Sequence, residues 1–293
     1  MGEVIKGRGS TGYLPGRFEV TVSERVDDGW HGEVAEEFAD VLPRTQVREE
    51  TARSIISRNT SPDISFSQSV NPYRGCEHGC SYCFARPSHA YLGLSPGLDF
   101  ETRLFVKTNA PELLRRELAK PKYEVSPIAL GINTDAYQPI ERKLQLTRRI
   151  IEVLAETRHP FSLITKNALV TRDLDLLAPL ARDNLVRVYL SVTSLDNRLS
   201  AVLEPRASAP HSRLRAIRQL RDAGVPVGAM VAPVIPWVND NEVEAVLEAV
   251  REAGADSAGY VLLRLPHEVA PLFRDWLQTH VPDRAAHVMS TIQ

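Results

Sequence analysis

The sequence predicts an α/β protein in which short strands alternate with longer amphipathic helices around a parallel sheet. From residue 64 onward, six short runs with β-forming residues are each followed by a segment with apolar residues at helical spacing. Ala223-Gly224 and Ala253-Gly254 end two of these helical segments, as C-terminal glycines commonly do. Six such units can form a partly closed barrel or an open doubly wound sheet.

The individual elements follow from these patterns. The expected strands are 64–70, 127–133, 161–166, 186–192, 226–234 and 259–265. The expected helices are 110–120, 142–158, 174–182, 211–224, 241–254 and 268–281. In the second helix, Leu144, Ile150, Ile151 and Leu154 share one face, which can therefore lie on a sheet.

Residues 1–60 lack such periodic runs, and we interpret them as an irregular, partly flexible N-terminal extension before a core domain at 61–293. The stretch GRGSTG contains Gly7, Gly9 and Gly12 in the spacing of a dinucleotide-binding motif. The motif requires a preceding strand and a following helix. Because neither is expected here, we interpret the stretch as part of a flexible arm.

Composition narrows the class of protein. Of 293 residues, 43% are hydrophobic and 25% are charged, which is ordinary for a folded globular protein. The formal net charge of −2 gives no global attraction to nucleic acid or to an anionic membrane, so a nucleic-acid partner is not supported by charge. The N-terminus lacks the apolar core of a signal peptide, and the longest apolar run is too short to span a bilayer. We expect a cytoplasmic protein.

Both candidate architectures place ligands at the carboxyl ends of the strands. The residues that follow the expected strands, in chain order, are the three cysteines after the first, Asn133, Thr134 and Asp135 after the second, Lys166 and Asn167 after the third, Thr193, Ser194 and Asp196 after the fourth, Trp237, Asn239 and Asp240 after the fifth, and Arg264 and His267 after the sixth. We therefore expect polar groups to gather on the same rim as the thiols.

All three cysteines lie in the stretch GCEHGCSYC, where Cys76, Cys80 and Cys83 have the spacing C-x3-C-x2-C. An odd number of cysteines disfavours a disulfide framework and favours metal ligation or catalysis. Three thiolates on one loop suit a metal centre with an open position, such as an iron-sulfur cluster with one iron lacking a protein ligand. The alternative is a closed structural zinc site completed by His78 or His89.

The cysteine spacing, with an aromatic residue just before the last cysteine, resembles the radical S-adenosylmethionine (SAM) superfamily. Within it, the chain is similar over roughly residues 50–290 to a bacterial branch described as similar to spore photoproduct lyase. The stretches that carry this likeness are NPYRGCEHGCSYCFAR, INTDAYQPIE, LITKN, VAPVIPWVND and GYVLLRLP. The resemblance implies a partial (β/α)6 TIM-like barrel of the radical SAM type.

It also implies that the three cysteines hold a 4Fe-4S cluster that cleaves SAM reductively to a 5′-deoxyadenosyl radical, which takes hydrogen from an unidentified substrate. Tyr82 would lie near the adenine, and the segment Asn133 to Asp135 near the methionine amino group. Ser191 and Thr193 lie where the superfamily contacts the ribose and the carboxylate. An electron donor such as flavodoxin or ferredoxin is implied as a partner.

Several of these residues also have simpler interpretations. Asp135 can cap the next turn instead of contacting SAM. Lys166 can bind an anionic group, or form an ordinary ion pair at the rim. Tyr82 can pack under the cysteine loop, and His78 can hydrogen-bond the backbone or a cluster sulfur. A noncatalytic iron-sulfur or zinc protein remains the alternative from a different class.

Three departures bear on the relation to spore photoproduct lyase. Relatives commonly have Pro where this chain has Ala136, and they continue past the last helix, so we expect an altered pocket. Spore photoproduct lyase uses a further cysteine as hydrogen donor, which this chain lacks. A lyase acting on DNA or RNA lesions would therefore need a substitute such as Tyr137 or Tyr260.

A basic stretch on the expected helix 211–224 is a second reason to consider nucleic acid as a binding partner. It comprises Arg213, Arg215, Arg218 and Arg221, joined by Arg206. Helical spacing places only some of these side chains on one face, and the apolar residues between them are typical of an amphipathic helix. We therefore favour a solvated face over a phosphate-binding patch.

Overall fold

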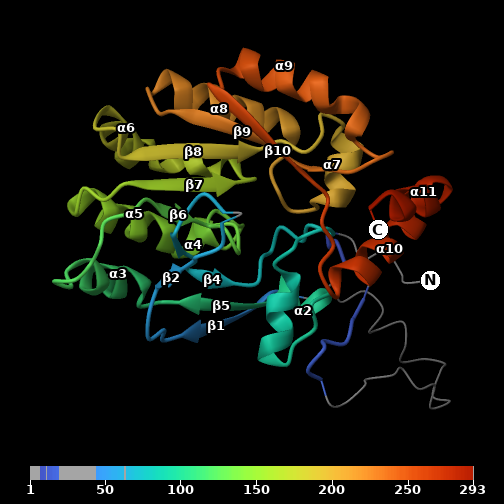
Figure 1. Cartoon of the computed structure of the whole chain (residues 1–293), viewed down its shortest axis with the longest axis horizontal. Coiled ribbons are helices and arrows are strands. Elements are labelled where there is room, and N and C mark those ends of the chain that lie inside the picture. The colour runs from blue at the N-terminus through green and yellow to red at the C-terminus, as the bar shows by residue number, and fades with distance from the viewer. Residues whose placement is uncertain (1–6, 11, 20–43, 63, 293) are drawn as a thin grey trace.

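The computed structural model describes residues 7–10, 12–19, 44–62 and 64–292 (Figure 1). Its larger sheet has seven strands in the order β10-β9-β8-β7-β6-β3-β2. These are β2 (Ile56–Arg58), β3 (Gln68–Val70), β6 (Ile128–Leu130), β7 (Phe161–Thr165), β8 (Val186–Ser191), β9 (Val227–Val234) and β10 (Ser257–Leu262). All neighbours pair in parallel except β2 and β3. The prediction of an α/β chain with a parallel sheet is confirmed.

The helices that connect the parallel strands lie close to their expected positions. They are α3 (Ala110–Leu118), α4 (Glu141–Leu144), α5 (Leu146–Glu156), α6 (Leu174–Arg182), α8 (Pro210–Asp222) and α9 (Val243–Ala253). Shorter elements are η1 (Arg86–Leu92), α2 (Leu98–Thr102), η2 (Ala168–Asp173), α7 (Asn197–Leu203) and η3 (Asp240–Glu242). The first five predicted helices are therefore present with small shifts at the ends, except that the second is divided into α4 and α5.

The order of the parallel strands distinguishes the two architectures. The strands β3, β6, β7, β8, β9 and β10 lie side by side in chain order. A doubly wound sheet would reverse direction at a switch point, whereas a barrel adds each new strand on the same side. The chain therefore has the strand order of a partial β/α barrel.

The core of the sheet is a row of apolar side chains at matched positions. Leu130 pairs with Leu163, Leu163 with Val188 and Val188 with Val227, and all four are buried. The strands β7 and β8 alternate buried and partly buried residues, as expected for a sheet covered by helices. This register brings the carboxyl ends of the central strands to one rim, where the polar loops begin.

The expected helix 142–158 is interrupted at Gln145, whose φ of 51° places it in the left-handed region. The cause is Glu141, whose carboxylate accepts hydrogen bonds from the backbone N–H of Thr147 (3.0 Å) and Arg148 (3.4 Å). These bonds satisfy N–H groups in the first turn of α5, so a new helix begins there. The helical spacing of apolar residues in the sequence does not reveal such a break.

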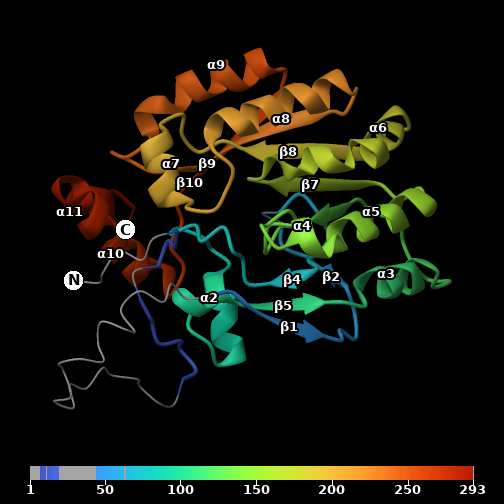
Figure 2. The same ribbon diagram turned by 180° about the vertical axis from the view of Figure 1, so that it is seen from behind.

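The N-terminal region contains strands that the sequence did not indicate. β1 (Gln46–Glu50) pairs in parallel with β5 (Arg103–Lys107), which pairs with β4 (Tyr73–Arg74) to form a second, three-stranded sheet. This smaller sheet lies next to α2, as both views show (Figure 1 and Figure 2). β1 and β2 thus fall within the predicted extension, of which residues 1–6, 11 and 20–43 lie outside the described residues.

Two helices follow the last strand, α10 (Val269–His280) and α11 (Pro282–Ile292), and the second was not predicted. They lie beyond the arrowhead ends of β7 and β8 (Figure 1). Their buried side chains, including Phe273 and Trp276, form an apolar cluster that also contains Cys80 and Tyr82. No helix in the described ranges is long and apolar enough to cross a bilayer.

Candidate active site around the cysteine loop

The three cysteines lie on the loop between β4 and η1, which we call the cysteine loop (residues 75–85). Cys76 and Cys80 are each 7% exposed and Cys83 is partly buried, and all three are free thiols. Gly75 and Gly79 have φ values of 78° and 67°, so the chain turns in ways that other residues rarely adopt. The sequence placed this loop directly after the first strand of the larger sheet, but β4 intervenes and belongs to the smaller sheet.

Burial is the main influence on the thiols. It raises the pKa of Cys76, Cys80 and Cys83, and in Cys76 the neighbouring carboxylate of Asp135 adds to the effect. In an environment that opposes the thiolate form, a bound cation is the partner that would stabilise it. Three thiols on one loop are the donor set that an iron-sulfur cluster uses. The residues therefore fit such a group.

Asp135, on the loop after β6, connects three segments. Its Oδ1 accepts hydrogen bonds from the backbone N–H of Tyr137 (2.8 Å) and the hydroxyl of Thr165 (2.7 Å). Its Oδ2 accepts one from the backbone N–H of Lys166 (2.8 Å) and lies 3.3 Å from His78 Nδ1. Burial opposes the charge, but these partners outweigh it and lower the pKa of Asp135. The capping role is therefore present, and it extends to the cysteine loop through His78.

Glu204, after α7, is a second carboxylate that connects several segments, and the sequence analysis missed it. This fully buried carboxylate accepts hydrogen bonds from the hydroxyls of Tyr82 and Thr193, the latter at 2.7 Å. It also pairs with the Arg213 guanidinium and lies 3.3 Å from Lys166 Nζ. Burial opposes ionisation, but the two cations outweigh it and lower the pKa of Glu204. Burial and the nearby carboxylate raise the pKa of Tyr82.

Lys166 contacts both of these carboxylates, Asp135 and Glu204. Its backbone N–H binds Asp135, whereas its Nζ lies near Glu204 and 5.7 Å from the centre of the Tyr82 ring. The side chain is 16% exposed, so part of it reaches solvent. The ion pair considered in the sequence analysis therefore exists, although its partner was not anticipated.

The remaining predicted site residues lie around the carboxylates of Asp135 and Glu204. Asn133 is exposed, and its backbone N–H binds Asn71 Oδ1 at 2.8 Å. Ser191 is buried, and its carbonyl oxygen accepts from Arg213 at 3.0 Å. Asn239 joins the same rim through its side chain, which donates to the Thr193 carbonyl at 2.7 Å. The loops after β6, β7, β8 and β9 thus converge on the cysteine loop.

Other rim residues lie outside this network. Trp237 is 53% exposed, has a φ of 64°, and its ring contacts His287 on α11. Arg264 and His267 are exposed. Among the two tyrosines considered as hydrogen donors, Tyr137 is fully buried and donates to Asp173 at 2.9 Å, whereas Tyr260 on β10 is 70% exposed.

The arginines of the basic stretch differ in how deeply they are buried. Arg213 is 1% exposed and is held by Glu204, so it cannot contact a phosphate on the surface. Arg215, Arg218 and Arg221 are exposed, as on an ordinary solvated face. Arg206 pairs with Glu77 at 2.9 Å. The arginines therefore do not form one patch.

The histidines proposed to complete a zinc site have other partners. His78 lies between Asp135 and Asn167, with 3.3 Å from its Nε2 to Asn167 Nδ2. His89 Nε2 lies 3.0 Å from the carbonyl oxygen of Arg103, and its ring packs edge-on against Phe100. Within the described ranges, no group of three or more His, Cys, Asp or Glu side chains is placed to hold a single metal ion.

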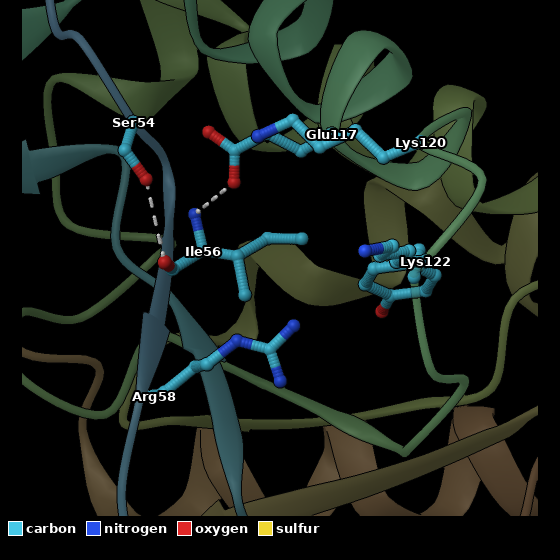
Figure 3. Close-up of a pocket in the computed structure, with 7 residues that line it drawn as sticks. Ser54, Ile56, Arg58, Glu117, Lys120 and Lys122 are labelled. Atoms are coloured by element: carbon cyan, nitrogen blue, oxygen red, sulfur yellow. Dashed lines mark hydrogen bonds between the residues drawn. The ribbon is translucent and has the colours of Figure 1, made fainter.

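A cavity of about 210 Å³ lies elsewhere, between β2 and the end of α3 (Figure 3). Arg58, Lys120 and Lys122 line it, and Glu117 lies at its edge. The Glu117 carboxylate is occupied by the backbone N–H of Ile55 and Ile56. None of the predicted site residues lines this cavity, so it is not a continuation of the cysteine loop.

The sequence relatives include proteins that are named only as uncharacterized. One from Mycobacterium bovis is 39% identical over 222 residues, which cover 75% of this chain and 65% of the relative. One from Methanocaldococcus jannaschii is 30% identical over 173 residues, covering 59% of this chain and 62% of the relative. The chain thus spans about two thirds of the length of the curated relatives that it matches.

Solved structures with a similar fold include a spore photoproduct lyase mutant with bound AdoMet and dinucleoside spore photoproduct. It is 16% identical, with a TM-score of 0.56, and the match covers 78% of this chain and 66% of that one. SuiB of Streptococcus suis bound to S-adenosylmethionine is 14% identical, with a TM-score of 0.51, covering 74% of this chain and 47% of that one. At these identities the likeness concerns the fold.

The family comparison covers the region that the geometry singled out. The model of the radical SAM superfamily matches residues 70–250, a segment longer than half the chain. It contains the cysteine loop, the partly buried Asp135 and the buried Glu204. With the consecutive parallel strands, a match of this extent means that the chain belongs to the radical SAM superfamily.

Proposed function

We propose that this protein is a radical SAM enzyme in which Cys76, Cys80 and Cys83 hold a 4Fe-4S cluster. When bound, such a cluster would supply the electron that cleaves SAM to methionine and a 5′-deoxyadenosyl radical, which would take a hydrogen atom from the substrate. The observation that carries the proposal is the position of the thiols. They lie together on one loop, beside the rim where four strand loops converge.

The chain's own residues would position SAM at this rim. We propose contacts from Tyr82, Asn133, Asp135, Ser191 and Thr193. Asp135 and Thr193 are each held by fixed hydrogen bonds, so their positions would change little when the ligand binds. Lys166 offers a partly exposed cation between the carboxylates of Asp135 and Glu204, which suits an anionic group of the ligand.

The proposal is tested by anaerobic reconstitution with iron and sulfide, followed by addition of SAM and dithionite. We expect a brown protein that bleaches on reduction and forms 5′-deoxyadenosine. Samples without dithionite, and the Cys80→Ser variant, serve as controls and should form none. If the cluster forms and bleaches but no 5′-deoxyadenosine accumulates, the radical chemistry is wrong. A colourless protein that retains one zinc would instead support the structural-metal alternative.

The same assay can be used to identify the substrate and the reductant. We propose a flavodoxin or ferredoxin as electron donor, to be tested in place of dithionite. The substrate of the main proposal is unidentified, and the alternative function is a lyase that acts on DNA or RNA lesions of the spore photoproduct type, which the family resemblance suggests. Tyr260, the exposed tyrosine of the two considered, would then be the hydrogen donor. Loss of repair in Tyr260→Phe would support that role, and unchanged repair would contradict it.

A further inference from the structure

The segment made of residues 7–10 and 12–19, which we call the strap, is attached to the body of the protein at several points. The Leu14 backbone exchanges two hydrogen bonds with the Ser95 hydroxyl, at 2.9 and 2.7 Å. Arg17 binds the carboxylate of Glu268, at the start of α10, through its backbone N–H (3.1 Å) and its Nε (2.7 Å). The described part of the predicted arm therefore contacts the body of the protein at these points.

The tightest contact is between Gly9 and the cysteine loop. A Cβ atom added at Gly9 would lie 1.7 Å from the carbonyl oxygen of Gly79 and 3.2 Å from the backbone nitrogen of Ser81. These are backbone atoms on both sides of Cys80, so they cannot yield as a flexible side chain would. Only glycine allows the strap to approach the loop this closely.

Glu101, on α2, links the strap to this loop. Its carboxylate is fully buried and accepts hydrogen bonds from the backbone N–H of Gly9 at 3.1 Å and of Ser10 at 2.9 Å. The same carboxylate pairs with Arg86 at 2.6 Å. One buried anion thus binds the strap on one side and a buried cation on the other.

Arg86 in turn holds the backbone of the cysteine loop. Its guanidinium is fully buried and has five N–H donors. Its acceptors are the carbonyl oxygens of Cys80 (2.9 Å), Gly79 (3.1 Å), Pro96 (3.1 Å) and Gly97 (2.9 Å), and the carboxylate of Glu101. Two of the acceptors belong to the segment between Cys76 and Cys83. The position of Cys80 therefore depends on Arg86, and the Glu101 carboxylate is the counter-ion that holds Arg86 in place.

We infer that Glu101 and the strap are positioning elements of the cysteine loop, which hold Cys80 in place and close the loop from outside. The inference rests on the proposed function only for the identity of the group that the thiols bind. Gly9 covers the backbone at Cys80, Glu101 fixes Gly9 and Arg86, and Arg86 fixes the loop carbonyls. Loosening the strap should therefore expose Cys80 without altering the parallel sheet.

The first test compares two glycine variants of the strap in the metal-free, reduced protein. Gly9→Ala introduces the clash with Gly79, whereas a Cβ at Gly12 would meet no atom within 4 Å, so Gly12→Ala is the matched control. The chain has three cysteines, so mass spectrometry after iodoacetamide resolves each labelling rate. We expect Cys80 to label about tenfold faster in Gly9→Ala. Gly12→Ala should label at the unmodified rate, and both variants should keep the thermal unfolding midpoint of the parent.

The second test uses the reconstituted protein and the release of iron to a chelator. Gly9→Ala and Glu101→Gln should release iron about tenfold faster than the parent and Gly12→Ala. Equal thiol labelling in Gly9→Ala and the parent would overturn the inference, as would equal acceleration in Gly12→Ala. If the parent binds no cluster, the proposed function fails, while the labelling rates still decide the role of the strap.

Discussion

Lys166 illustrates at the scale of one residue how this site is built. Its backbone N–H binds the partly buried carboxylate of Asp135, and its ammonium group approaches the buried carboxylate of Glu204. Asp135 could be predicted, because it follows a strand and parallel strands end on a common rim. Glu204 could not, because it follows a short helix that leads away from the strand, and no periodic pattern distinguishes it from surface glutamates.

Removing the charge of Glu204 tests its place in the network. Glu204→Gln leaves the buried Arg213 without its counter-ion, so we expect the free energy of unfolding to fall by about 3–5 kcal/mol. Urea denaturation followed by circular dichroism measures this loss. The control is Glu244→Gln on the exposed face of α9, which should change stability by less than about 0.5 kcal/mol. Similar losses in both variants would contradict a structural role for the Glu204 charge.

At the scale of the elements, the predictable parts are those with long, regular patterns. The alternation of buried residues in β7 and β8 and the apolar faces of α5 and α8 follow directly from the sequence. The break at Gln145 does not, because it depends on where the Glu141 side chain finds its partners. The three strands of the smaller sheet are short, and they pair with segments distant in sequence, which local patterns cannot reveal.

A pair of glycine substitutions tests the break between α4 and α5. Gln145 is exposed and has a left-handed backbone, so Gln145→Gly removes a steric penalty and should stabilise the protein by about 0.5–1 kcal/mol. Gln219 is exposed within the regular helix α8, so Gln219→Gly should destabilise by about 1 kcal/mol. The two shifts in the urea midpoint should therefore have opposite signs. Destabilisation by both would mean that Gln145 makes contributions beyond its backbone conformation.

At the scale of the whole molecule, most buried apolar side chains belong to the two largest of the three apolar clusters among the described residues. The larger one lies in the parallel sheet and its helices, and it follows from the six repeated units of the sequence. The smaller one joins α10 and α11 to Cys80 and Tyr82. The helical pattern of α10 was evident, but its docking on the cysteine loop joins residues nearly 200 positions apart. The strap meets α10 at Glu268, so both ends of the described chain hold the same site.

If the two apolar clusters unfold locally and independently of each other, a core substitution in one cluster should accelerate hydrogen exchange only in that cluster. Phe273→Leu alters the smaller cluster and Phe161→Leu, on β7, the larger one; both side chains are buried. Each change should cost about 1 kcal/mol, which corresponds to about a fivefold faster hydrogen exchange wherever opening is local. For Phe273→Leu we expect this acceleration in α10, α11 and residues 80–82, with unchanged exchange in β7 and β8. For Phe161→Leu the strands should accelerate instead. Equal acceleration in both regions for either variant would mean that the molecule opens as one cooperative unit, and that the cysteine loop shares the stability of the sheet.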